Sequence, residues 1–209
     1  MKHIFIHGLG QTSLSWNKTI RYIEGQPEIV RLNLSELLQD KKITYESLYK
    51  AFSDYCIDFS EPFNICGLSL GGILALQYGI ENPSKVNSLV LIGTQFVMPK
   101  RLLKLQNVVF HIMPNSSFAQ MGFGKKDFIE LTKSMIDLDF RHDLKKLLCE
   151  VLIVCGEKDK VNKKASIELN RLLPYSEIQL IENAGHEINI DEPEELGRIL
   201  NGFFLQNML

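Results

Sequence analysis

The chain has 209 residues, of which 45% are hydrophobic and 23% are charged. This composition is typical of one globular domain and excludes disordered and fibrous classes. The 23 basic and 25 acidic residues give a formal net charge of −2, which provides no overall electrostatic footprint for nucleic acid or anionic lipid. Because no apolar run approaches the roughly 20 residues that span a bilayer, we expect neither a nucleic-acid partner nor a membrane partner.

The cysteines indicate a reducing compartment. Cys56, Cys66, Cys149 and Cys155 form no C-x-x-C pair, and no spacing of His and Cys is typical of zinc. Residues 1–8 are too short and too polar for a signal peptide. We therefore expect a cytoplasmic protein with free thiols and no metal site.

Six short runs rich in Ile, Val, Leu and Phe predict β-strands at 2–7, 28–33, 63–67, 86–92, 150–155 and 177–182. They are apolar on both faces, which is typical of parallel strands in a covered sheet. Helices are predicted at 45–57, 70–81, 163–173 and 192–206. The alternation predicts an α/β fold, with a mostly parallel six-stranded sheet and helices on both of its faces.

One stretch, residues 95–143, interrupts the alternation because it is much longer than an ordinary connection. It contains two helix-like segments, 100–112 and 127–137. We expect a small helical cap inserted into a core that is formed by residues 1–94 and 144–209. We expect its many apolar residues to belong mainly to packed helix faces: Leu102, Leu103, Leu105, Val108, Val109, Phe110, Ile112, Met113, Phe118, Met121, Phe123 and Phe128.

The strongest motif is Gly67-Leu68-Ser69-Leu70-Gly71, which is followed by Gly72 and matches G-x-S-x-G. A predicted strand leads into it and a predicted helix follows, as this motif requires. A side chain at the apex of so sharp a turn has strained dihedrals, and the flanking glycines remove side chains that would collide there. The pattern favours Ser69 as a nucleophile that faces a helix N-terminus.

A serine hydroxyl is a poor nucleophile unless a base removes its proton. His186 follows the predicted strand 177–182, and catalytic side chains gather at the carboxyl ends of parallel strands. We therefore expect His186 to be the base. The other histidines are expected to have structural or surface positions: His3, His7, His111 and His142.

The imidazole needs a carboxylate that fixes its tautomer and stabilises its positive form. Asp159 lies in a polar loop after strand 150–155, again at a carboxyl end, and Glu157 is a nearby alternative. The loop 93–95 offers no carboxylate. Asp159 is therefore the leading candidate for the acid.

Acyl transfer also requires donors for a developing oxyanion. One is expected from the backbone N–H of Leu70, directly after the nucleophile, and the second from Leu9 in the loop after the first strand. Gly8 and Gly10 allow this loop to turn its amide inward. A dinucleotide loop is excluded because the G-x-G-x-x-G pattern fails at Ser13.

Together these segments resemble the α/β-hydrolase superfamily, in order and over nearly the whole chain: His7-Gly8, Gly67–Gly72, Gly156-Glu157-Lys158-Asp159 and Asn183-Ala184-Gly185-His186. The resemblance implies a serine hydrolase without a cofactor, usually acting on carboxylic esters or related acyl compounds. In this family Ser69, Asp159 and His186 match the nucleophile, acid and base, in the expected chain order. Leu9 and Leu70 match the oxyanion-hole positions.

Two features depart from the family pattern. The chain begins at what resembles the third strand of the family sheet, so the antiparallel strands at the N-terminal edge are missing. A proline often precedes the strand that carries the acid, whereas this chain has Cys149-Glu150. The first departure leaves one edge of the sheet uncovered.

The expected reaction is cleavage of an ester or thioester of a small, largely apolar acyl substrate. We expect Gly8, Leu68, Phe110, Met113 and Phe128 to bind that substrate, in part beneath the insertion. A serine at this turn distinguishes the chain from relatives that use aspartate or cysteine there. Two alternatives remain open: a C–C hydrolase or lyase with the same triad, and a non-catalytic small-molecule receptor. The sequence leaves the oligomeric state undetermined.

Overall fold

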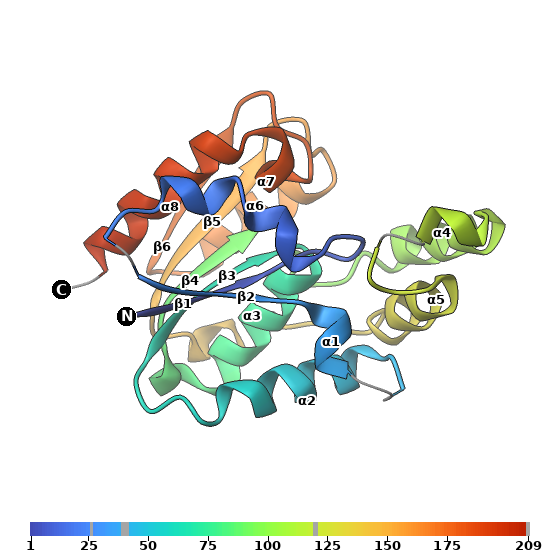
Figure 1. The fold of residues 1–209 in the computed structure, drawn as a ribbon, viewed down its shortest axis with the longest axis horizontal. Coiled ribbons are helices and arrows are strands. Elements are labelled where there is room, and N and C mark those ends of the chain that lie inside the picture. Colours follow the sequence, from blue (N-terminus) through green and yellow to red (C-terminus); the bar gives the residue numbers. More distant parts are fainter. Residues whose placement is uncertain (26, 39–41, 119–120, 208–209) are drawn as a thin grey trace.

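A computed structural model describes residues 1–25, 27–38, 42–118 and 121–207. Its centre is a six-stranded sheet in the order β2-β1-β3-β4-β5-β6, in which every neighbouring pair is parallel (Figure 1). The strands are β1 (Lys2–Ile6), β2 (Glu28–Leu32), β3 (Phe63–Leu68), β4 (Val86–Ile92), β5 (Glu150–Gly156) and β6 (Ser176–Ile181). The predicted α/β fold is therefore confirmed.

The inner and edge strands differ in burial. Strands β3, β4 and β5 are almost completely buried, which explains their continuous apolar runs. Strands β2 and β6 are partly exposed because each lies at an edge of the sheet and has a neighbour on one side only. The β2 edge carries Glu28 and Arg31, and such charges disfavour edge-to-edge pairing.

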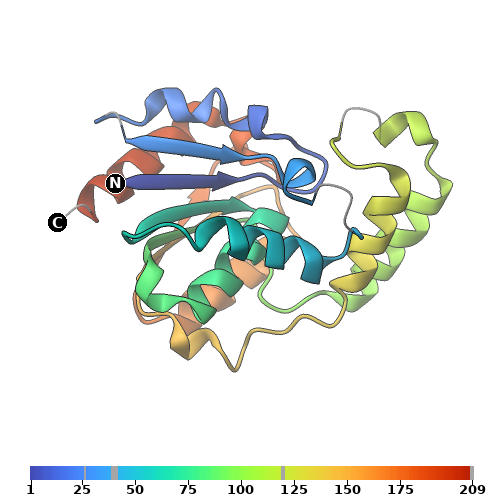
Figure 2. The ribbon, with the colours of Figure 1, turned by 60° about the horizontal axis from the view of Figure 1, so that its bottom comes forward.

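Helices cover both faces of the sheet (Figures 1 and 2). The larger apolar cluster contains α1 (Leu34–Leu38), α2 (Tyr45–Cys56), α3 (Leu70–Glu81) and α6 (Asn162–Leu172). The smaller cluster contains the 3-10 helix η1 (Ser13–Trp16), α7 (Ile188–Asp191) and α8 (Pro193–Gln206). No helix in the described ranges is long and apolar enough to cross a bilayer.

Strand β1 contributes side chains to both apolar clusters, one on each face of the sheet. Ile4 and Ile6 belong to the larger cluster, and Phe5 belongs to the smaller one. Successive side chains of a strand point to opposite faces, so a continuous apolar run supplies both layers.

The 95–143 insertion leaves the sheet after β4 and returns before β5. It forms α4 (Lys100–Ile112) and α5 (Lys125–Ser134), which pack together at the end of the molecule opposite the chain termini (Figures 1 and 2). Its two legs are joined by backbone hydrogen bonds: Phe140 N–H donates to Phe96 O at 2.9 Å, and Met98 N–H donates to Leu138 O at 3.0 Å. The insertion therefore leaves and rejoins the sheet through one paired stem.

The insertion departs from the sequence expectations in two ways. Helix α5 begins before the expected position because the Asp127 carboxylate accepts the N–H of Gly124 at 2.8 Å, and it ends at Ser134, where the chain turns toward the stem. The second difference concerns the apolar residues of α4, which do not all lie on packed faces. Five of them are exposed: Leu102, Leu105, Val108, Val109 and Ile112.

Candidate active site

Ser69 lies at the apex of the turn between β3 and α3. Its backbone has φ 53° and ψ −110°, a conformation that costs roughly 1–3 kcal/mol for a residue with a side chain. Two hydrogen bonds hold the turn: Ser69 N–H donates to Ile92 O at 2.8 Å, and Ser69 O accepts from Ile73 N–H at 3.0 Å. The surrounding sheet and helix thus impose the strained conformation that the motif predicts.

The glycines of the motif are required by close backbone packing. A Cβ at Gly67 would lie 2.3 Å from Gly71 O, and a Cβ at Gly71 would lie 2.3 Å from Ile6 O. A Cβ at Gly72 would lie 2.0 Å from Thr94 Oγ1. Glycine is therefore required at these positions because α3 lies very close to β3, β1 and the loop after β4.

His186 and Asp159 come together from two loops at the carboxyl edge of the sheet. His186 Nδ1 lies 2.7 Å from Asp159 Oδ2. The Asp159 side chain is only 5% exposed, whereas that of His186 is 40% exposed. Burial raises the pKa of the Asp159 carboxyl, but hydrogen bonds from His186 and Asn162 outweigh burial and hold this pKa below its ordinary value. The aspartate is therefore kept as a carboxylate beside the imidazole.

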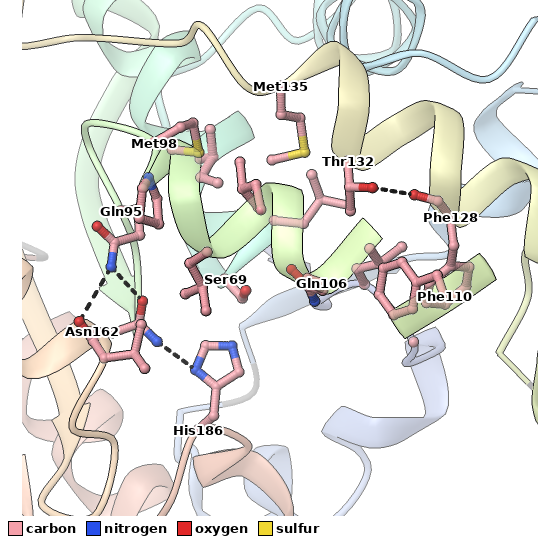
Figure 3. Close-up of a pocket in the computed structure, with 18 of the residues that line it drawn as sticks. Ser69, Gln95, Met98, Gln106, Phe110, Phe128, Thr132, Met135, Asn162 and His186 are labelled. Atoms are coloured by element: carbon pink, nitrogen blue, oxygen red, sulfur yellow. Dashed lines mark hydrogen bonds between the residues drawn. The ribbon is translucent and has the colours of Figure 1, made fainter. Parts of the chain in front are cut away.

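Two amide side chains that the sequence analysis did not identify complete this arrangement. Asn162 donates from Nδ2 to both Asp159 carboxylate oxygens, at 3.0 and 2.7 Å, and its backbone N–H donates to Oδ1 at 3.1 Å. Gln95 Nε2 in turn donates to Asn162 Oδ1 at 2.7 Å (Figure 3). The spacing of Asp159 and Asn162 across the start of α6 is a weak signal of a helix-capping contact, and Gln95 carries no signal in the sequence.

Gly93 is a further residue whose place near the site was not predicted. It has φ +54°, and a Cβ at this position would lie 3.0 Å from His186 Nδ1 and 3.1 Å from Cε1. The same atom would be 3.5 Å from Asp159 Oδ2. The loop after β4 therefore packs directly against the histidine and its carboxylate partner.

Ser69 and His186 line the same cavity, and Figure 3 shows the imidazole edge opposite Nδ1 facing Ser69. Among the hydrogen bonds of the described residues, none joins Ser69 Oγ to the imidazole. Catalytic hydrogen bonds often shorten only when substrate binds, so this geometry is compatible with proton transfer.

The loop after β1 packs against the nucleophile turn. A Cβ at Gly8 would lie 3.5 Å from Ser69 Cβ and 2.7 Å from Leu68 Cδ2. His7 anchors the loop, because its Nε2 accepts from Leu34 N–H at 3.1 Å and its Nδ1 lies 2.8 Å from Gly8 O. Burial is the main cause of the lowered pKa of His7, which is therefore neutral and structural.

The two residues whose backbone N–H groups are expected to hold an oxyanion lie at the cavity. Leu9 and Leu70 both line the cavity. Within the described residues, no protein acceptor receives the N–H of either leucine. Leu70 is the first residue of α3, and N–H groups in the first turn of a helix have no partner within the helix. Both donors are therefore available to a ligand.

The cavity has a volume of about 480 Å³ and lies between the carboxyl edge of the sheet and the insertion. Its wall on the insertion side is mainly apolar: Met98, Pro99, Leu102, Leu103, Phe110, Met113, Phe118, Met121, Phe128 and Met135. Gln106 projects a polar amide from the same side (Figure 3). No lysine or arginine is among the described residues that line the cavity. The site therefore offers an apolar chamber next to a small polar end.

The expected substrate-binding residues divide into two groups. Phe110, Met113 and Phe128 line the cavity. Gly8 and Leu68 are not among its lining residues, and Leu68 packs in the cluster beneath α8 on the other sheet face. The expectation of a Leu68 side chain at the substrate is corrected by its position in β3, where alternation directs it away from the cavity.

The remaining candidates from the sequence lie apart from this arrangement. His3 is completely buried, and burial lowers its pKa to about 4. His111 and His142 are exposed, as is Glu157, which was the alternative to Asp159. Neither exposed histidine lines the cavity. The geometry therefore brings together Ser69 and His186 with Asp159, and none of the alternatives.

Comparison with known proteins shows which family the chain belongs to. The chain is 23% identical over 238 residues to RutD of Escherichia coli O157:H7, a proposed carbamate hydrolase, over 94% of this chain and 88% of RutD. It is 26% identical over 143 residues to the pimeloyl-acyl-carrier-protein methyl ester esterase of Legionella pneumophila strain Corby, over 68% and 59% of the two chains. The structure of MenH from S. aureus has 16% identity and a TM-score of 0.81, over 100% of this chain and 95% of MenH.

These identities are too low to carry an activity from one protein to another, but the fold is shared. The sequence profile of the alpha/beta hydrolase fold matches residues 4–148, which is more than half of the chain. The chain therefore belongs to the alpha/beta hydrolase fold family.

Proposed function

We propose that this hydrolase cleaves a carboxylic ester or thioester of a small, largely apolar acyl substrate, with Ser69 as nucleophile, His186 as base and Asp159 as acid. The observation that supports the proposal most directly is the 2.7 Å contact between His186 Nδ1 and Asp159 Oδ2, at the wall of a cavity that Ser69 also lines. An imidazole held in this way has its second nitrogen free to accept a proton from a serine.

In the first half of the reaction, Ser69 Oγ attacks the substrate carbonyl carbon while His186 takes the serine proton. The C–O or C–S bond to the leaving group then breaks, and the imidazolium returns this proton to the leaving alcohol or thiol. The product that remains is an acyl ester of Ser69. The Asp159 carboxylate stabilises the imidazolium that forms between the two proton transfers.

In the second half, His186 takes a proton from water, and the resulting hydroxide attacks the acyl carbon. The bond to Ser69 Oγ breaks, the serine recovers its proton, and the carboxylic acid product leaves. Negative charge develops on the carbonyl oxygen in both halves. The N–H groups of Leu9 and Leu70, which have no acceptor among the described residues, are suited to stabilise this charge.

We infer that the 95–143 insertion acts as a helical cap on a core formed by residues 1–94 and 144–209. Its contribution of most of the apolar cavity wall supports this division, as does the paired stem at Phe96 and Phe140. A cavity of about 480 Å³ is in the range of small-molecule sites. Methionines adapt to irregular shapes, so Met98, Met113 and Met135 suit flexible acyl chains.

The proposal is tested with p-nitrophenyl esters of graded acyl length and with a fluorescent alkyl phosphonate that labels activated serines. The intact protein should hydrolyse the esters and take up the label. Ser69→Ala should lose both, with a rate reduction of roughly 10³- to 10⁶-fold. Ser53→Ala, a change in α2 away from the cavity, is the matched control and should keep both.

The outcomes separate the alternatives. Rapid labelling of Ser69 without turnover of any ester or thioester would favour C–C bond cleavage with the same triad. Absence of both labelling and turnover in a folded protein would favour a non-catalytic receptor. Ester hydrolysis that survives in Ser69→Ala would overturn the proposed nucleophile.

A further inference from the structure

The outer face of α4 is apolar and exposed. Leu105, Val108, Val109 and Ile112 form this α4 outer face, and Ile112 is 80% exposed. Their spacings of three, four and seven residues place them on one face of the helix. Helix α4 lies at the end of the molecule opposite both termini (Figures 1 and 2). A contiguous exposed apolar face of this kind is typical of an interaction site.

Positive charge accompanies this apolar face. The sequence of α4 contains Lys100, Arg101 and Lys104 and no acidic residue. A surface groove between α4 and α5, with a volume of about 480 Å³, is lined by Lys104, Lys133 and His111, by the polar Asn107 and Thr132, and by three apolar side chains. Within the described residues, no ion pair engages Lys104 or Lys133, whereas Lys100 is paired with Asp137 at 2.6 Å. The face therefore offers both apolar contact and unpaired cations.

The α4 outer face is continuous with the cavity wall. Leu102 lies on α4 beside this face, is 38% exposed, and also lines the cavity. Leu103, the next residue, lines both the cavity and the outer groove. A partner seated on the α4 outer face would therefore lie one side-chain layer from the acyl chamber.

The apolar and basic character of the α4 outer face favours some kinds of partner over others. In a two-fold contact between copies of the chain, this face would meet a second α4, which has no acidic residue and so offers no anionic partner to Arg101 and Lys104. Nucleic acid would leave the exposed isoleucine, leucine and valines without an apolar partner. An anionic lipid surface can contact both the apolar and the basic residues of this face. Its acyl chains accommodate the apolar side chains, and its phosphate groups attract the cations. The net charge of −2 for the whole chain does not describe this local surplus.

We propose that the α4 outer face docks on an anionic lipid surface, with α4 lying in the plane of the interface. Leu105, Val108, Val109 and Ile112 enter the boundary between headgroups and acyl chains, and Lys104 and Lys133 face the phosphates. The contact is peripheral and reversible, since one short amphipathic helix buries limited apolar area. It goes beyond the proposed esterase reaction and is independent of Ser69.

The test is co-sedimentation of the full chain with vesicles of phosphatidylcholine alone or mixed with phosphatidylglycerol. We expect binding to the anionic vesicles that weakens as salt is raised. Ile112→Gln should weaken binding roughly tenfold, because one large apolar side chain no longer partitions into lipid. The matched control is Ile57→Gln, an exposed isoleucine at the far end of α2 that should bind as the unmodified protein does.

The contribution of the lysines to vesicle binding is tested separately with two double variants. Lys104→Gln combined with Lys133→Gln should reduce binding to anionic vesicles roughly tenfold or more and leave the weak binding to phosphatidylcholine unchanged. Lys18→Gln combined with Lys145→Gln removes two exposed lysines elsewhere and should have no effect. All variants carry changes at exposed positions, and their thermal unfolding is checked alongside.

Three results would overturn the proposal. The first is the absence of binding to either kind of vesicle. The second is an equal loss in Ile112→Gln and Ile57→Gln. The third is a dimer, seen by light scattering, that Ile112→Gln dissociates, because the α4 outer face would then be covered by a second copy of the chain.

Discussion

The side-chain amide of Gln95 donates a hydrogen bond to Asn162 Oδ1 at 2.7 Å. This bond fixes which end of the Asn162 amide faces Asp159, since Nδ2 is then directed at the carboxylate. The loops after β4 and β5 are thereby joined at the group that holds the imidazole. Gln95 and Asn162 are therefore positioning residues, which act on the proposed base through Asp159.

Replacement of Asn162 by leucine should lower kcat on a p-nitrophenyl ester by roughly 10- to 100-fold, which corresponds to the loss of hydrogen bonds to a charged group. KM should change little, because the amide acts through Asp159 on proton transfer. Gln95→Met should have a smaller effect, since it removes only the bond that orients the amide. An Asn162→Leu protein that is folded and retains full kcat would contradict this role.

Gly93→Ala should impair catalysis by displacing His186. The added Cβ would lie 3.0 Å from His186 Nδ1, so either the loop or the imidazole must move. Displacement by a fraction of an ångström is expected to reduce kcat by roughly tenfold or more. Gly25→Ala is a matched control, because Gly25 also has positive φ but no described residue beyond its chain neighbours lies within 4 Å of its Cβ position. That control should lose stability, by about 1–2 kcal/mol, without loss of kcat.

The strained backbone at Ser69 predicts that a glycine variant at this position is more stable than an alanine variant. At φ 53° and ψ −110° glycine is unstrained, so Ser69→Gly should be about 1 kcal/mol more stable than Ser69→Ala. The opposite order is expected at Ser53 in the middle of α2, where glycine is less favourable than alanine by about 1 kcal/mol. Urea unfolding of the four variants measures both differences. The same order at the two positions would show that the turn stores no strain.

Buried His3 should make the protein sensitive to mild acid. Burial lowers its pKa from 6.5 to about 4, so between these values the unfolded chain binds a proton that the folded chain does not. The free energy of unfolding therefore decreases as pH falls through this window, by a total on the order of 3 kcal/mol. His3→Leu should show a smaller decrease between about pH 7 and pH 5 in urea unfolding. An unchanged pH dependence in the variant would exclude His3 as a source.

The absence of lysine and arginine from the described cavity lining predicts selectivity against anionic acyl groups. A p-nitrophenyl ester of a monocarboxylic acid should be hydrolysed faster than the half ester of the dicarboxylic acid of equal length, since a buried carboxylate would lack a partner. Gln106→Lys should raise kcat/KM for the half ester by roughly tenfold or more. Gln106→Met is the neutral control. A half ester that is hydrolysed as rapidly as the simple ester would contradict this selectivity.

Local patterns predicted much of the framework. The strand and helix positions followed from apolar runs and their breaks, and helix 100–112 was predicted with the bounds that the structure has. The turn at Ser69 was predictable because Gly67 and Gly71 must be glycines for the turn to close, which leaves a local trace in the sequence. These features depend on neighbours within a few residues.

Contacts between loops that are distant in the sequence could not be predicted from local patterns. Gln95 meets Asn162, and Gly93 lies beside His186 and Asp159, only because β4, β5 and β6 are neighbours in the sheet. Their residue types have no pattern of their own, so they could not be singled out by local reasoning. The same is true of the face on which Leu68 lies, which depends on the register of β3 with its neighbours.

The sequence by itself determined the order of strands and helices, the family and the residues with the chemistry of a nucleophile, a base and an acid, because these depend on residue type and local spacing. Only the tertiary structure decided that His186 contacts Asp159 and that Glu157 remains exposed. It also decided that one apolar face of α4 lies outside the packed core. The physical reason is that periodicity reveals which faces of an element are apolar, whereas the packing of the whole chain decides which of them are covered.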